Sequence, residues 1–135
     1  MPTVVSYSSR DLLASKIVPP GWYRVMVDDI SSEPSADGKS MNYPVEGTII
    51  CNADDGTTDF AGVPLGIGKS WMFNSKVISF SIDFLRSFGV EINADTRYDL
   101  DASKGKILDV FVENDTYQGR LKNKVNHKYR PAKGM

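Results

Sequence analysis

Apolar and polar residues alternate in two segments of the first half of the chain. In WYRVMVDDI, residues 22–30, the second, fourth and sixth side chains are apolar. Because successive side chains of a β-strand point to opposite faces, this alternation predicts a strand with one buried face. MNYPVEGTIIC, residues 41–51, predicts a second strand, in which Pro44 and Gly47 indicate a bulge or an unpaired edge.

A change of period from two to about 3.6 residues predicts one helix in SKVISFSIDFLRSFG, residues 75–89. Asn74 or Ser75 is a suitable N-cap, and Gly89 suits the left-handed position that often ends a helix. A short third strand is expected just before, at residues 70–74. The apolar stripe expected to form the buried face of the helix is Val77, Phe80, Phe84 and Phe88.

Two more strands are predicted after the helix, GKILDVFVEN at residues 105–114 and RLKNKVNHKY at residues 120–129. The order is that of a five-stranded OB barrel with its helix between strands 3 and 4, although other small α+β domains share it. We predict a mostly β chain with one α-helix, folded as a single OB-fold domain over residues 1–135. Residues 1–18 are expected to form a flexible arm and residues 131–135 a flexible tail. OB surfaces bind oligonucleotides and oligosaccharides.

The stretch AGVPLGIGKSWMF, residues 61–73, contains a Gly-Lys-Ser tripeptide like that of a phosphate-binding P-loop. A P-loop needs a glycine five positions before the glycine of that tripeptide and a helix after it. The position five before Gly68 is Val63, and the tripeptide is followed by Trp71-Met72-Phe73, which favours a strand. We therefore interpret the stretch as a loop or hairpin that enters a strand.

Composition is that of a globular protein, with 41% hydrophobic and 24% charged residues among 135. No apolar run approaches the roughly 20 residues that span a bilayer, and the first residues lack the pattern of a secretion signal. We expect a cytoplasmic protein with no membrane contact. One cysteine, Cys51, and one histidine, His127, exclude an internal disulfide and nearly exclude a protein-only zinc site, so no metal or cofactor is predicted.

Charge is distributed unevenly, although the net charge is only −1. Residues 119–135 carry six basic side chains and no acid, whereas the rest of the chain has a formal charge of −7. In the last predicted strand, a period of two sorts Arg120, Lys122, Lys124, Asn126 and Lys128 onto one face. Either the preceding strand neutralises this face with its acids, Asp109, Glu113 and Asp115, or the face binds a polyanion.

A surface that binds single-stranded nucleic acid also needs exposed aromatic residues, because a base stacked on a ring contributes roughly 1–3 kcal/mol to binding. About half of a strand's side chains point into a barrel, so only some rings can be exposed. The candidates are Trp22, Tyr23, Tyr43, Trp71, Phe73, Tyr117 and Tyr129. Catalysis has little support, because His127 is the only histidine and lies among cations that disfavour its protonated form. Asp28 and Asp29 would point to opposite faces of one strand.

Three segments together resemble the small bacteriophage single-stranded DNA-binding proteins of OB-fold type. They are VPPGWYRVMVDDISSEPSADGKSMNYPVEGTI, the helix end FLRSFGVE, and GKILDVFVENDTYQGRLKNKVNHKYRP, so that the resemblance covers roughly residues 18–131. It implies a protein that covers single strands in the cytoplasm of the infected cell during DNA replication or recombination. This chain ends in YRPAKGM and lacks an acidic tail, which puts recruitment of partners through such a tail in doubt.

We therefore expect a non-enzymatic protein that binds single-stranded DNA with little sequence preference. The alternative is a small β-barrel that acts as a protein-interaction or virion structural component with a basic docking strand. A homodimer and contacts with replication or recombination proteins remain open. The residues predicted to bind nucleic acid are Arg24, Tyr43, Lys69, Trp71, Phe73, Lys76, Arg120, Lys122, Lys124, Lys128 and Tyr129.

Overall fold

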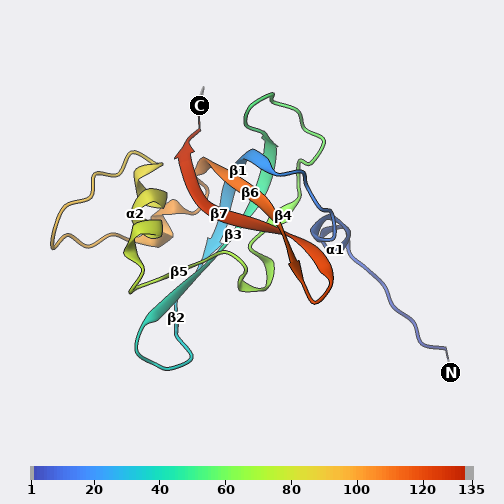
Figure 1. The fold of residues 1–135 in the computed structure, drawn as a ribbon, viewed down its shortest axis with the longest axis horizontal. Helices are drawn as coiled ribbons and strands as arrows, with labels where there is room; N and C mark the ends of the chain where they lie inside the picture. Colours follow the sequence, from blue (N-terminus) through green and yellow to red (C-terminus); the bar gives the residue numbers. More distant parts are fainter. Residues whose placement is uncertain (1, 133–135) are drawn as a thin grey trace.

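The computed structural model describes residues 2–132, which form a mostly β structure (Figure 1). Its strands are β1 Gly21–Ile30, β2 Glu33–Pro34, β3 Met41–Asn52, β4 Pro64–Leu65, β5 Met72–Asn74, β6 Ile107–Tyr117 and β7 Arg120–Pro131. Its α-helices are α1 Ser9–Ala14 and α2 Ile78–Arg86, and two short 3₁₀ turns are η1 Ile67–Lys69 and η2 Leu100–Ser103. Neither α-helix is long and apolar enough to cross a membrane.

The strands form one antiparallel sheet in the order β2-β3-β1-β6-β7, and β4 and β5 also pair with β3. The predicted strands are all present, and α2 lies between the predicted third and fourth strands. The expected count of five is wrong, because the chain adds the two-residue strands β2 and β4 along β3. Over residues 2–132 the strand pairings describe an open sheet, with β7 at one edge.

A second helix, α1, was not expected, because residues 1–18 were predicted to form an arm. Ser8 begins this helix with a capping box, in which its hydroxyl accepts from the Asp11 N–H and the Asp11 carboxylate accepts from the Ser8 N–H. The chain is then tied to the sheet, because the Asn123 side chain accepts from the Val18 N–H and donates to the Lys16 carbonyl. Of the expected tail, residues 133–135 lie outside the described residues.

Helix α2 ends as predicted but begins differently. Gly89 has φ +80° and completes a Schellman motif, in which its N–H donates to Arg86 O at 2.9 Å and the Val90 N–H donates to Leu85 O at 3.4 Å. Asn74 and Ser75 do not cap the helix. Their side chains instead accept hydrogen bonds from the backbone N–H groups of Lys76 and Met41.

The core lies between the inner face of the sheet and α2. From the helix only Phe84 is fully buried, and it packs against Trp71, Phe73 and Tyr129. The rest of the predicted stripe is partly exposed, because α2 covers the sheet with one narrow face and leaves Val77 and Phe80 toward solvent. The sheet contributes the alternate aliphatic side chains Val25, Val27, Ile49, Leu108, Val110 and Val112.

Candidate nucleic-acid interface

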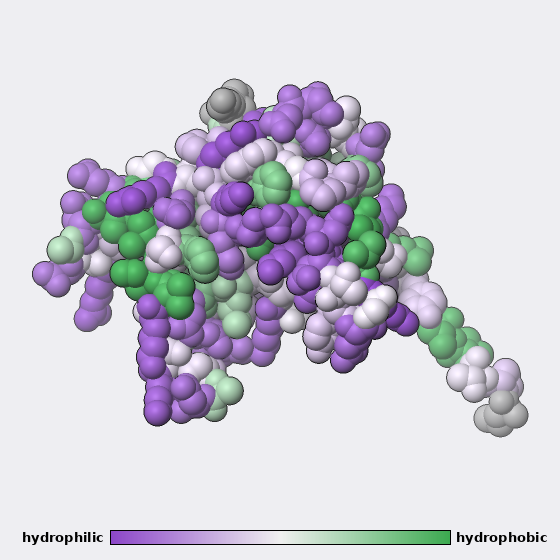
Figure 2. Space-filling view, viewed as in Figure 1, coloured by the Kyte–Doolittle hydropathy of each residue, from purple (hydrophilic) through white to green (hydrophobic). Residues whose placement is uncertain are grey.

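Strand β7 sets its cations opposite the acids of β6. The register pairs Lys122 with Asp115 and Lys124 with Glu113, and paired residues of neighbouring strands share a face. Lys124 Nζ lies 4.0 Å from an oxygen of Asp115. The carboxylates of β6 therefore neutralise part of the basic face, as one of the two sequence interpretations expected. Figure 2 shows hydrophilic surface across the middle of the view, where Figure 1 draws β7.

A bulge in β7 interrupts the predicted alternation. Val125 pairs with Val112 and Tyr129 with Val110, so that three residues of β7 span a single residue of β6, Phe111. His127 at the centre has φ +46°. Asn126 and Lys128 nevertheless lie on the predicted face, because Asn126 Nδ2 donates a hydrogen bond to Glu113 Oε1 and Lys128 Nζ lies 5.2 Å from the centre of the Phe111 ring.

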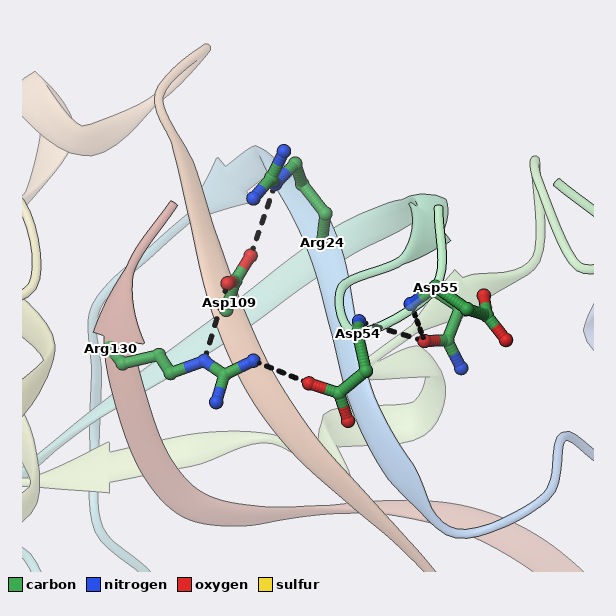
Figure 3. A network of polar contacts seen from close by, with 6 residues as sticks. Arg24, Asp54, Asp55, Asp109 and Arg130 are labelled. Atoms are coloured by element: carbon green, nitrogen blue, oxygen red, sulfur yellow. Dashed lines mark hydrogen bonds and ion pairs between the residues drawn. The ribbon is translucent and has the colours of Figure 1, made fainter. Parts of the chain in front are cut away.

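A buried carboxylate of β6 binds one arginine from each neighbouring strand, Arg24 of β1 and Arg130 of β7 (Figure 3). Asp109 is 1% exposed and accepts hydrogen bonds from Arg24 Nε at 3.2 Å and from Arg130 Nε at 3.4 Å. Arg130 Nη2 also donates to Asp54 at 2.9 Å, and its guanidinium lies over the Trp22 ring, 4.3 Å from the ring centre. The hydrogen bonds that Arg130 donates to Asp54 and Asp109 raise the pKa of its guanidinium. Arg24, predicted to help bind phosphate, is thus held by an internal partner.

Three predicted stacking rings belong to the core. Trp71 is 0% and Phe73 1% exposed, so neither ring can stack on a base in this structure. Tyr129 packs against both, and its Oη accepts a hydrogen bond from Trp71 Nε1 at 2.9 Å. Burial raises the pKa of the Tyr129 hydroxyl. The assignment of these rings to ligand is wrong, because the side chains of β5, β7 and α2 cover one another.

His127 adjoins this cluster. Its ring stacks on Phe80 at a centroid distance of 4.2 Å, and its Nδ1 lies 2.9 Å from Tyr129 Oη. Burial, with a smaller effect of the Lys124 charge, lowers the pKa of the imidazole. The imidazole is therefore held between the Phe80 ring and the Tyr129 hydroxyl.

Tyr43 and Lys76 lie apart from the basic face. Tyr43 lines a pocket of about 420 Å³ in which three acids, Asp29, Asp99 and Asp101, outnumber one lysine, Lys104, and this excess of negative charge disfavours phosphate. Lys76 is exposed in the turn before α2 and lines none of the pockets described below. The structure therefore does not bring these two predicted residues together with the cations of β7.

A groove beside the β6–β7 hairpin brings three predicted cations together. Lys69 from the Gly-Lys-Ser loop and Arg120 and Lys122 from β7 line a space of about 580 Å³, which the end of the N-terminal arm also borders. Tyr117 lies in the same groove, 62% exposed, with Lys122 Nζ 5.0 Å from its ring centre. Lys69 Nζ also contacts Glu33 at 2.9 Å. Two distant segments of the sequence thus converge on one cationic groove.

The stretch around the Gly-Lys-Ser tripeptide is a loop that enters a strand, as expected, and one of its glycines packs closely on β3. Gly66 has φ +85°, and a Cβ on it would collide with the carbonyl oxygen of Val45 on β3. Gly68 has φ +70° and open space around it. The loop continues through η1 into β5, so no helix N-terminus follows Lys69 to receive a phosphate.

Several residues that lie beside the predicted cations were not in the predicted set. Trp22 and Tyr117 were candidate stacking rings that the predicted set left out. Phe111, Arg130 and Arg86 were not in that set either. A pocket of about 530 Å³ at the edge of β7 joins Trp22 and Lys128 to Arg86 of α2. The signal for Phe111 was present in the sequence, because it alternates with Asp109 and Glu113 and so lies on the polar face of β6.

Comparison with known proteins gives no family for this chain: no protein-family model matches it, and no curated protein matches it. Among residues 2–132 no group of three histidine, cysteine, aspartate or glutamate side chains is arranged to hold a metal ion.

Proposed function

We propose that this chain is a non-enzymatic protein with an OB-type barrel that binds single-stranded DNA with little sequence preference. One observation carries the proposal. Along the outer face of β1, β6 and β7, three flat rings each lie next to a cation, at 4.3 Å for Trp22 and Arg130, 5.2 Å for Phe111 and Lys128, and 5.0 Å for Tyr117 and Lys122. A single strand offers one base and one phosphate per nucleotide, so a repeated ring and cation match its two chemistries.

The outer face keeps an excess of positive charge even after its internal ion pairs are counted. Six cations lie on it or at its hairpin end: Arg24, Arg120, Lys122, Lys124, Lys128 and Arg130. The acids on the same two ladders are Asp109, Glu113 and Asp115, and Asp54 of the neighbouring loop pairs with Arg130. Lysines are flexible, so a Lys that rests on a ring can rotate toward a phosphate and free the ring face for a base. This excess supports binding of a flexible polyanion.

The strand order supports an OB-type barrel. Read from β5 through β3, β1 and β6 to β7, it is the order of a five-stranded barrel that is open between its two end strands, β5 and β7, and OB barrels are partly open. The packing of Tyr129 on Trp71 and Phe73 spans this opening. We also propose that the bound single-stranded DNA continues along the β6–β7 hairpin into the groove lined by Lys69, Arg120 and Lys122.

The proposed role is to cover single strands during phage DNA replication or recombination in the cytoplasm of the host cell. It rests on the resemblance of residues 18–131 to phage single-stranded DNA-binding proteins. No base-reading pocket is invoked, because stacking and phosphate contacts are tolerant of sequence.

Binding of labelled oligo-dT and of a duplex of equal length, followed by fluorescence anisotropy between 50 and 200 mM salt, tests the proposal. We expect preference for the single strand. If about four phosphates are neutralised, the logarithm of the affinity should fall with the logarithm of salt concentration with a slope near −3, at about 0.7 per phosphate. Equal binding of both DNAs, or a flat response to salt, would favour instead a protein-interaction or virion component whose basic strand docks on an acidic partner.

A further inference from the structure

Arg130 is shared between two carboxylates in different surroundings (Figure 3). Asp109 is buried and binds Arg130 through Nε, whereas the Asp54 side chain is 63% exposed and binds it through Nη2. The guanidinium is also fixed against Trp22. One edge of a preorganised guanidinium therefore faces an acid that solvent can reach.

The loop around Asp54 does not depend on this carboxylate for its own shape. The Asn52 side chain accepts hydrogen bonds from the backbone N–H groups of Asp54 and Asp55, and the Asn52 N–H donates to the Thr57 carbonyl. The Ala53 N–H donates to the Trp22 carbonyl, which ties the loop to β1. Within residues 2–132, Arg130 is the one side chain that the Asp54 carboxylate contacts.

We propose that the Asp54 carboxylate stands where a DNA phosphate binds, and that a phosphate of the single strand replaces it on Arg130 with the adjoining base near Trp22. This inference rests on the proposed function and assigns one phosphate position and one competing residue within it.

Physical differences between the two carboxylates decide which of them exchanges. An exposed ion pair contributes little net stability, so a phosphate can displace Asp54 at small cost. Removing a buried partner leaves an uncompensated charge, so Asp109 stays in place and keeps Arg130 oriented. The planar guanidinium matches two phosphate oxygens as well as it matches a carboxylate. Asp54 therefore lowers the affinity for DNA without blocking the site.

The test compares Asp54→Asn with Asp59→Asn, a matched control in the same loop. Asp59 is exposed and makes no ion pair or side-chain hydrogen bond within the described part of the chain. Each change removes one negative charge and keeps the side-chain shape. At 150 mM salt we expect Asp54→Asn to tighten oligo-dT binding about 2- to 5-fold, as loss of a competing exposed ion pair allows. Asp59→Asn should change it by less than about 1.5-fold, because salt screens a distant charge.

A double-mutant cycle with Arg130→Gln then tests whether the gain in affinity for oligo-dT depends on Arg130. In the Arg130→Gln background, Asp54→Asn should not increase the affinity. If circular dichroism shows that Arg130→Gln does not fold, Arg130→Lys, which keeps a cation beside Asp109, is used as the background instead. In Arg130→Lys, the gain in affinity from Asp54→Asn should be smaller than in the wild-type protein.

Each result decides the matter. Equal gains from Asp54→Asn and Asp59→Asn would overturn the inference, because only net charge would then act. So would a gain from Asp54→Asn that persists in the Arg130 variants, or no gain in a wild-type background that binds oligo-dT. Failure of the wild-type protein itself to bind oligo-dT would instead overturn the proposed function, and the inference with it.

Discussion

At the scale of single residues, Tyr129 shows why a ring in a basic strand need not face a ligand. Its Oη accepts from Trp71 Nε1 at 2.9 Å, and its ring packs on Trp71 with centroids 6.3 Å apart. Both groups lie in the cluster around Phe84. The Tyr129 hydroxyl therefore provides the acceptor for the buried Trp71 N–H, and the Tyr129 ring packs in the core instead of facing a ligand.

Removal of the Tyr129 hydroxyl distinguishes a role in stability from a role in DNA binding. In Tyr129→Phe the buried Trp71 Nε1 loses its acceptor, so the free energy of unfolding should fall by about 1–3 kcal/mol in urea denaturation. Affinity for oligo-dT should stay unchanged. Tyr117→Phe is the control, because its exposed ring loses a hydroxyl in solvent and stability should change by less than about 0.5 kcal/mol. A loss of affinity without a loss of stability in Tyr129→Phe would return this ring to the interface.

At the scale of elements, the Gly-Lys-Ser loop is defined by its contact with β3. Gly66 is needed for two reasons, its positive φ and the approach of the Val45 carbonyl, whereas Gly68 is needed only for its positive φ. A loop whose glycine packs against a strand positions Lys69 at the hairpin groove.

Two alanine substitutions measure this difference. Gly66→Ala should lower the free energy of unfolding by roughly 2–5 kcal/mol, since it combines left-handed backbone strain with a steric collision. Gly68→Ala should lower it by only about 1–2 kcal/mol, the cost of the backbone conformation alone. Urea denaturation of both variants gives the comparison. Equal losses would mean that the loop does not pack on β3 as described.

At the scale of the whole molecule, a net charge of −1 conceals a surface on which cations exceed acids. This surface arises because β6 and β7 pair along their length and carry their charges on the same face. Acidic residues lie on other faces, such as Asp29, Asp99 and Asp101 in the pocket of Tyr43. Under the proposed function, the distribution of charge and not its sum sets where DNA binds.

Two substitutions that each remove one positive charge test this distribution. Lys122→Gln should weaken binding to all base compositions alike and make the salt slope less steep by about 0.7, the share of one phosphate contact. Lys39→Gln, in the turn between β2 and β3, should leave the slope unchanged. Neither change lies in the core, so neither should alter stability by more than about 0.5 kcal/mol. Equal effects of both on the slope would show that DNA does not follow the β6–β7 face.

The sequence by itself determined the main strands, the helix with its Gly89 terminus, the absence of a P-loop and the gathering of cations in the last strand. These are properties of local period, backbone preference and composition. Alternation along a strand separates two faces, but it does not say which face another element will cover. That is why the sequence assigned Trp71, Phe73 and Tyr129 to DNA and overlooked Phe111.

Only the tertiary structure decided which rings are exposed, which acid faces each cation, and which distant residues meet. α2 and β5 bury one set of rings, the register of β6 and β7 pairs Lys122 with Asp115, and the bulge at His127 shifts the side chains that follow it. The convergence of Lys69 with Arg120, and of Asp54 with Arg130, joins residues far apart in the chain. Such contacts depend on long-range packing, which no local pattern encodes.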